Sequence, residues 1–120
     1  MKPYQDARVK GEKLAKQYAE LEKADQVDFY NGLEGYYSVL GHNKKQEAIA
    51  VLIEKNDHKI YVYQLDKGIS QDKAATISRE KGASDIDKIT FGRYQDKPIW
   101  EVKSGNQYYL VDFETGAVIQ

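Results

Sequence analysis

The strongest constraint on the fold is a pair of alternating apolar runs near the C-terminus, at 99–103 and 108–112. Between the runs lies Gly105-Asn106, and both residues tolerate the positive φ angles of a two-residue hairpin loop. The sequence therefore predicts a β-hairpin with a fixed register. That register pairs Ser104 with Gln107, Val102 with Tyr109 and Trp100 with Val111.

The predicted register sorts the hairpin's side chains onto two faces, because side chains alternate along a strand. One face is a predicted core face, and it holds Trp100, Val102, Tyr109 and Val111. The other is mixed, with Ile99, Tyr108 and Leu110 among Glu101, Lys103 and Asp112. An apolar centre with a charged rim is the composition of an interface core. Ile99, Tyr108 and Leu110 are therefore candidates for a contact, either with the first half of the chain or with a protein partner.

The rest of the chain predicts two helices and further strands. Apolar residues spaced by three and four predict a helix over 4–23, with Gly11 on its apolar stripe where the helix could approach a neighbour closely. Ser70 reads as the N-cap of a second helix and Gly82 as its left-handed stop. The predicted strands are 27–30, 36–40, 48–54, 60–63, a C-terminal sheet from Ile86, and a short last strand at 118–119.

The order helix, strands, helix, strands predicts an α+β fold built from two tandem units. The expected boundary lies within the segment Leu65-Asp66-Lys67-Gly68, giving units 1–66 and 67–120, each a helix on a small antiparallel sheet. Units of about 60 residues bury only about 60% of their unfolded surface and are marginal alone. We therefore expect the two to pack together.

Composition excludes several kinds of function. A net charge of −1 with both signs interspersed lacks the basic stripe of a nucleic-acid binder, and the absence of cysteine excludes disulfides and thiolate chemistry. His42 and His58 each lie beside a turn without further ligand spacing, so we expect no metal site. We expect no catalytic residues, no cofactor and no small-molecule substrate. Carboxylate pairs on strands stay open as glycosidase acids, although Glu101 is expected to pair with lysines on a wet face.

Tyrosines are numerous on the predicted strands, and two interpretations of them remain open. They could pack within the sheets as cross-strand pairs, or some could form an aromatic platform for a protein or a glycan. The residues concerned are Tyr36, Tyr37, Tyr61, Tyr63, Tyr94, Tyr108 and Tyr109.

The C-terminal third resembles a PepSY domain. The resemblance rests on Gly92-Arg93-Tyr94, Ile99-Trp100-Glu101-Val102, Tyr108-Tyr109-Leu110-Val111-Asp112 and Thr115-Gly116-Ala117-Val118. It implies a helix followed by a small antiparallel sheet, in a class of domains that mostly work outside the cytoplasm and inhibit, chaperone or regulate partners.

Over nearly its whole length the chain resembles the TseB-like (YpmB) family of cell-wall elongation regulators. The shared stretches are Tyr36-Tyr37-Ser38-Val39-Leu40-Gly41, Ile60-Tyr61-Val62-Tyr63 and Gly68-Ile69-Ser70 with the helix after it. The resemblance implies a cystatin-like first unit and a PepSY-like second unit. It also implies a non-enzymatic regulator in Gram-positive bacteria that binds a membrane-anchored class B penicillin-binding protein, a peptidoglycan transpeptidase. The expected location is the extracytoplasmic side of the cell membrane, reached through an N-terminal anchor that these 120 residues do not contain.

Two other functions remain open at this point. The chain could be a PepSY-type inhibitor or chaperone module for a secreted peptidase, and capture of a metallopeptidase instead of a transpeptidase would indicate this. It could also be an enzyme or carrier that uses the cystatin-like unit as a pocket, which would require a deep cavity lined by converging polar groups.

Overall fold

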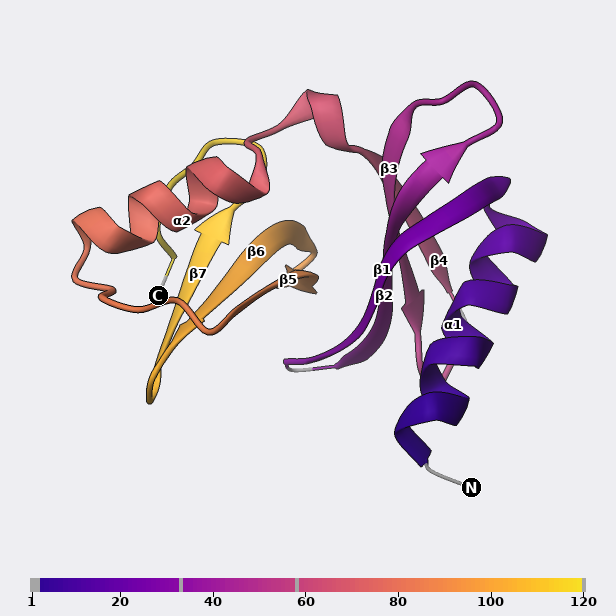
Figure 1. The fold of residues 1–120 in the computed structure, drawn as a ribbon, viewed down its shortest axis with the longest axis horizontal. Coiled ribbons are helices and arrows are strands. Elements are labelled where there is room, and N and C mark those ends of the chain that lie inside the picture. Colours follow the sequence, from indigo (N-terminus) through magenta and orange to yellow (C-terminus); the bar gives the residue numbers. More distant parts are fainter. Residues whose placement is uncertain (1–2, 33, 58, 120) are drawn as a thin grey trace. The chain divides into compact units, whose positions relative to one another are not determined.

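In a computed structural model the chain forms two units, Met1–Leu65 and Asp66–Gln120. The structure describes residues 3–32, 34–57 and 59–119, without the side chains of residues 3–8 and 18. Each unit has one α-helix and one antiparallel sheet, so the α+β class is confirmed (Figure 1). The boundary between the units lies one residue before the expected one.

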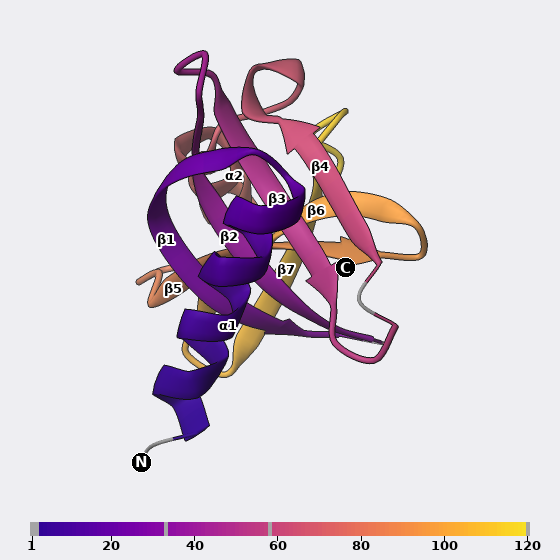
Figure 2. The same ribbon diagram turned by 90° about the vertical axis from the view of Figure 1, so that its right-hand side faces the viewer.

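The first unit is a helix followed by a four-stranded antiparallel meander. Helix α1 spans Pro3–Tyr18 and packs on strands β1, β2 and β3. The sheet has the order β1-β2-β3-β4. Its strands are β1 (Leu21–Asn31), β2 (Gly35–Asn43), β3 (Ala48–Glu54) and β4 (Ile60–Gln64). Figure 2 shows α1 lying across this sheet, with β4 at its margin.

The first helix is shorter than the sequence pattern predicted. It ends at Tyr18, and Glu20 has a φ angle of +57°, which breaks the helix before Leu21 begins β1. Leu21 is still buried, as the apolar spacing suggested, but it reaches the core from a strand. Tyr4, Ala7 and Tyr18 of the predicted apolar stripe lie outside the described side chains, and His58 lies outside the described residues.

The core between α1 and the sheet is aliphatic and centres on a row of valines. Val27 pairs with Val39, Val39 with Val51, and Val51 with Val62 across the four strands. The first three are buried. On the helix side Ala15 is buried and Leu14 is packed against the same cluster.

The second unit begins with a short 3₁₀ turn, Leu65–Lys67, which crosses the boundary, and continues into α2 (Gln71–Glu80). The predicted caps are confirmed. The Ser70 Oγ accepts a hydrogen bond of 3.0 Å from the Lys73 N–H, and Gly82 follows the helix with a φ angle of +116°. These caps fix where α2 begins and ends.

Three strands complete the second unit: β5 (Lys88–Tyr94), β6 (Lys97–Ser104) and β7 (Gln107–Asp112), in the order β5-β6-β7. The predicted hairpin register is confirmed at every pair. Gly105 has the expected positive φ angle of 60°. The last predicted strand is reduced to a single bridge between Val118 and Val111.

Helix α2 and the segment before it cover the predicted core face of the hairpin. Trp100 is 2% exposed, and its indole makes edge contacts with Phe91 and Phe113 at centroid distances of 4.9 Å and 6.4 Å. Val102 and Val111 are fully buried, and Tyr109 is half-buried. The assignment of this face to the core is therefore confirmed.

The turn after β7 explains part of the PepSY resemblance in physical terms. The Asp112 Oδ1 accepts hydrogen bonds from the N–H groups of Glu114 and Thr115, at 2.8 Å and 3.0 Å. Gly116 takes a φ angle of +82°, which favours glycine. The Asp-x-x-Thr-Gly pattern is thus the sequence of a carboxylate-capped turn.

Candidate functional site

The three predicted contact residues share one face of the β6–β7 hairpin, directed away from α2. In the register, Ile99 lies opposite Asp112, Leu110 opposite Glu101, and Tyr108 opposite Lys103. Ile99 is fully buried and Leu110 is 6% exposed, whereas Tyr108 is 54% exposed. Of the three, Tyr108 is the one that presents its ring at the surface.

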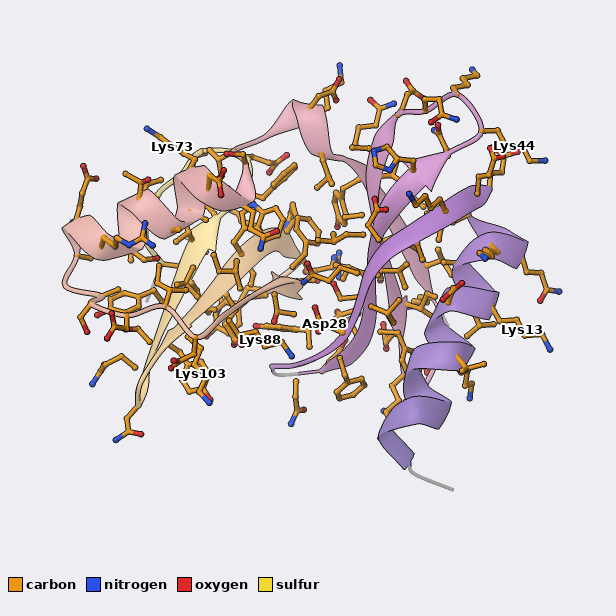
Figure 3. The ribbon with its side chains drawn as sticks, in the orientation of Figure 1. Lys13, Asp28, Lys44, Lys73, Lys88 and Lys103 are labelled. Carbon is orange, nitrogen blue, oxygen red and sulfur yellow. The ribbon has the colours of Figure 1, made fainter. Side chains whose placement is uncertain are left out.

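This face of the β6–β7 hairpin is less exposed to solvent than the sequence pattern suggested. Glu101 was expected on a wet face beside lysines, but burial raises the pKa of its carboxyl group above the ordinary value, and the positive charge of Lys88 opposes this only in part. Lys88 pairs with Lys103 at the end of the sheet, where Figure 3 shows both side chains. Alternation alone missed this burial because it assigns faces but not what covers them.

His42 is held by a carboxylate at the end of β2. Its Nδ1 lies 2.9 Å from an Asp25 carboxylate oxygen, and both side chains are about 40% exposed. A small polar hollow of about 270 Å³ beside it is lined by Glu22, Lys23, His42, Asn43 and Gln46. The amide of Asn43 is already occupied, because its oxygen accepts from the N–H groups of Lys45 and Glu47. The His42–Asp25 pair is a partly exposed structural contact next to a turn.

The carboxylates of Glu34, Glu54 and Asp57 influence one another at one end of the first sheet. Burial raises the pKa of Glu54, and the negative charges of Glu34 and Asp57 raise it further, while Lys59 lowers it. Within the described residues, no group of three or more histidine, aspartate or glutamate side chains is arranged to hold a metal ion. Burial first, and then the neighbouring negative charges, explain the raised pKa, which Lys59 offsets only in part.

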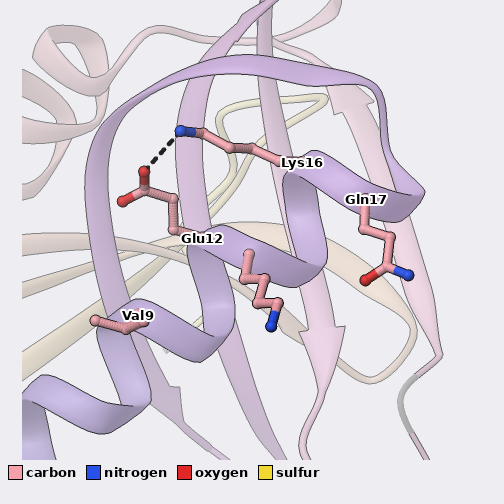
Figure 4. A pocket seen from close by; sticks show the side chains of 5 residues that line it. Val9, Glu12, Lys16 and Gln17 are labelled. Atoms are coloured by element: carbon pink, nitrogen blue, oxygen red, sulfur yellow. Dashed lines mark ion pairs between the residues drawn. The ribbon is translucent and has the colours of Figure 1, made fainter.

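A larger hollow, of about 570 Å³, lies open along the outer face of α1 (Figure 4). Its lining residues are spaced by three and four along the helix, and the Lys16 Nζ is 2.9 Å from a Glu12 carboxylate oxygen. Such exposed pairs stabilise little. The described lining is Val9, Glu12, Lys13, Lys16 and Gln17, which is an ordinary solvated helix face apart from Val9. It lacks the depth and converging polar groups of a substrate pocket.

Among the described side chains of the first unit, several tyrosines pack rather than form an open platform. Tyr30, Tyr36 and Tyr37 are buried, and the rings of Tyr36 and Tyr61 meet edge to face at 6.3 Å. The packing interpretation of the sequence is confirmed for Tyr36, Tyr37 and Tyr61.

Large apolar side chains that stay exposed are few in the part of the chain that the structure describes. They are Val9, Val62, Tyr108 and Ile119. Sequence reasoning singled out Tyr108 and missed Val62, because the order of strands in the sheet makes β4 an edge and the sequence pattern does not give that order. Neither described helix has the length and apolar character needed to cross a membrane.

Three comparisons relate the chain to known proteins. A family model described as "Cell wall elongation regulator TseB-like domain" matches residues 10–54. A Bacillus subtilis (strain 168) protein named "Probable cell wall elongation regulator TseB" is 37% identical over 114 residues, covering 88% of this chain and 70% of that protein. The solved structure of the YpmB protein from Bacillus subtilis matches with a TM-score of 0.78 and 31% identity, over 100% of this chain and 96% of that one. The chain therefore belongs to the TseB-like family of cell-wall elongation regulators.

Proposed function

We propose that this protein regulates cell-wall elongation without catalysing a reaction, by binding a class B penicillin-binding protein on the extracytoplasmic side of the membrane. The observation that carries the proposal is the 37% identity with a relative named as a cell-wall elongation regulator, over most of both chains. A regulator of a wall-building reaction needs contact with a component of that reaction. A peptidoglycan transpeptidase is the component that makes the cross-links.

The local chemistry is compatible with a binding role. The described residues hold no metal-binding group, the hollow along α1 is open, and the hollow beside His42 is small. The partly buried carboxyl group of Glu101 shares its face with Lys103 and Asp112. Glycoside hydrolysis uses a pair of carboxyl groups, but the Asp112 Oδ1 already accepts hydrogen bonds from the main chain of the turn after β7. Membrane attachment through a segment before this chain is part of the same proposal.

The experiment is a direct binding measurement with two purified extracytoplasmic probes. One is the ectodomain of the elongation-specific class B penicillin-binding protein from the same organism, and the other is a secreted metallopeptidase from it. The immobilised protein should bind the transpeptidase saturably and leave the peptidase unbound. Binding or inhibition of the peptidase alone would overturn the proposal in favour of a PepSY-type inhibitor or chaperone module.

A further inference from the structure

The outer edge of β4 is an open template for strand addition, and we infer that an extended segment of the protein partner binds there as a fifth strand. The inference rests on the proposed function, because it gives the partner of that function a place to bind. It is argued from three observations: the direction of the main-chain groups, the absence of protecting features, and an unfinished apolar row.

The hydrogen-bond pattern shows which main-chain groups of β4 face outward. The Glu54 N–H donates to the Lys59 oxygen at 2.8 Å, so this pair is bonded across the β3–β4 turn. Bonded pairs alternate along antiparallel strands, which makes Leu52–Tyr61 and Ala50–Tyr63 the next bonded pairs in the register.

The N–H and C=O groups of Ile60, Val62 and Gln64 therefore point away from β3. The side of β3 that faces β2 shows the same alternation. There the Lys55 N–H donates to the Gly35 oxygen at 2.9 Å, so Lys55 bonds toward β2 while its neighbour Glu54 bonds toward β4. No described strand pairs with the outer side of β4, which ends the sheet order (Figure 2).

Two other sheet edges in this protein, β1 and β7, carry protection that β4 lacks. Strand β1 has two register shifts and several exposed charged residues, both of which discourage pairing. Along β7, residues 117–119 are bonded, with the Ile119 N–H donating to the Leu110 oxygen at 2.7 Å. The five residues of β4 include no charge, no proline and no shift in register.

The side chains at this edge leave an apolar row incomplete. Val62 is the last member of the valine row that crosses the sheet, and it is 49% exposed although Val39 and Val51 beside it are fully buried. A fifth strand would place one side chain directly opposite Val62 on that face. An aliphatic residue there would extend the core and remove Val62 from water.

These features define the occupant as a short, extended, uncharged segment with an aliphatic residue at its centre. A five-residue edge is about 17 Å long. That suffices for a peptide segment, whose affinity in strand addition comes from main-chain hydrogen bonds. The surface that one such short edge can bury is small beside the roughly 800 Å² per partner that a stable complex of two folded copies buries. The segment therefore belongs to a partner protein rather than to a second copy of this chain.

Two substitutions at one position separate the main-chain and side-chain parts of the inference. Val62→Lys places a charge at the centre of the edge. Val62→Pro removes the outward N–H but no hydrogen bond to β3, because the Val62 N–H does not bond to β3. Val9→Lys is the matched control, since Val9 is 67% exposed and lies on α1.

Binding to the purified ectodomain of the class B penicillin-binding protein is measured for all four proteins, together with their melting temperatures. We expect both Val62 variants to bind at least ten-fold more weakly while melting close to wild type, and Val9→Lys to bind normally. In the complex, the amide protons of Ile60, Val62 and Gln64 should exchange more slowly than in the free protein.

The possible failures point to different causes. If the wild type does not bind the ectodomain, the proposed function fails. If the wild type binds and the Val62 variants bind equally well without slowed exchange at β4, the fifth-strand inference is overturned and the function stands. If sedimentation shows a dimer that Val62→Lys dissociates, the edge is occupied by a second copy, and the inference is again overturned.

Discussion

The indole nitrogen of Trp100 donates a hydrogen bond of 3.0 Å to the main-chain oxygen of Ile69, the residue before the N-cap of α2. This bond joins the middle of the second sheet to the start of the helix that covers it. The same side chain is 2% exposed and packs against two phenylalanine rings. Trp100 therefore both packs in the core of the second unit and supplies a hydrogen bond to the Ile69 oxygen.

Replacing Trp100 should destabilise the second unit severely. Trp100→Ala should lower the free energy of unfolding by about 3–5 kcal/mol, the usual cost of truncating a buried aromatic side chain. Trp100→Phe keeps most of the packing and loses the hydrogen bond to Ile69, so its cost should be smaller. Thermal and denaturant unfolding measure both. An alanine variant that melts within two degrees of wild type would contradict the buried position.

The contact of Gly11 with Tyr37 predicts a graded response to side-chain size. A Cβ atom at position 11 would lie 3.2 Å from the Tyr37 Cβ, a tight contact that needs a small shift. Gly11→Ala also gains about 1 kcal/mol of helix propensity, so its net effect should be small. Gly11→Leu should destabilise by about 1–3 kcal/mol through overpacking.

Urea unfolding of the Gly11 variants tests this, with Lys13→Leu as the control on the exposed side of the same helix. The control should change stability little. Equal stability of Gly11→Leu and wild type would mean that α1 can move away from Tyr37 without cost.

The raised pKa of Glu101 predicts a pH-dependent effect. Its carboxyl group binds a proton more tightly in the folded chain than in the unfolded one, so the folded state loses stability as pH rises through the raised pKa. Glu101→Gln should therefore melt slightly higher than wild type at pH 7. This advantage should disappear below the ordinary value of 4.5, where wild type is protonated in both states. A glutamine variant that is less stable at pH 7 would show that the charged form is favoured.

Tyr108 and Leu110 should respond differently although they lie on one face. Leu110→Asp places a charge at a site that is 6% exposed and should lower the melting temperature by many degrees. Tyr108→Ala should melt like wild type because the ring is exposed. If Tyr108→Ala also weakens capture of the penicillin-binding protein, its ring belongs to the partner surface. Unchanged capture would remove Tyr108 from the proposed contact.

The parts of the fold that sequence predicted well are those set by local chemistry. The Gly105-Asn106 loop fixed the register of its hairpin, and Ser70 and Gly82 set the ends of α2, because each depends on a few adjacent residues. The end of α1 was predicted five residues too late. The apolar spacing continues through Leu21, and nothing in it reveals the left-handed turn at Glu20.

Long-range features were harder to predict. Strand β1 was recognised only at 27–30 because its register shifts interrupt the two-residue alternation over 21–26. The pattern placed Ile99, Tyr108 and Leu110 on one face correctly, but exposure depends on tertiary packing, and Tyr108 differs from the other two. Val62 was missed as a contact residue because the order of strands in the sheet, and not the sequence of β4, makes it an edge.

The segment after β7 protects the outer edge of the second sheet from pairing with other molecules. The Asp112 N–H donates to the Ala117 oxygen at 2.8 Å, and with the Ile119–Leu110 bond this closes the outer side of β7. Among the described residues, the turn after β7 and the Val111–Val118 bridge hold that segment against the sheet. Disruption of Asp112 or Gly116 would release it and expose a strand rich in tyrosine, leucine and valine. The first consequence of such damage would be aggregation through new intermolecular sheets, before any loss of the helix that covers the other face.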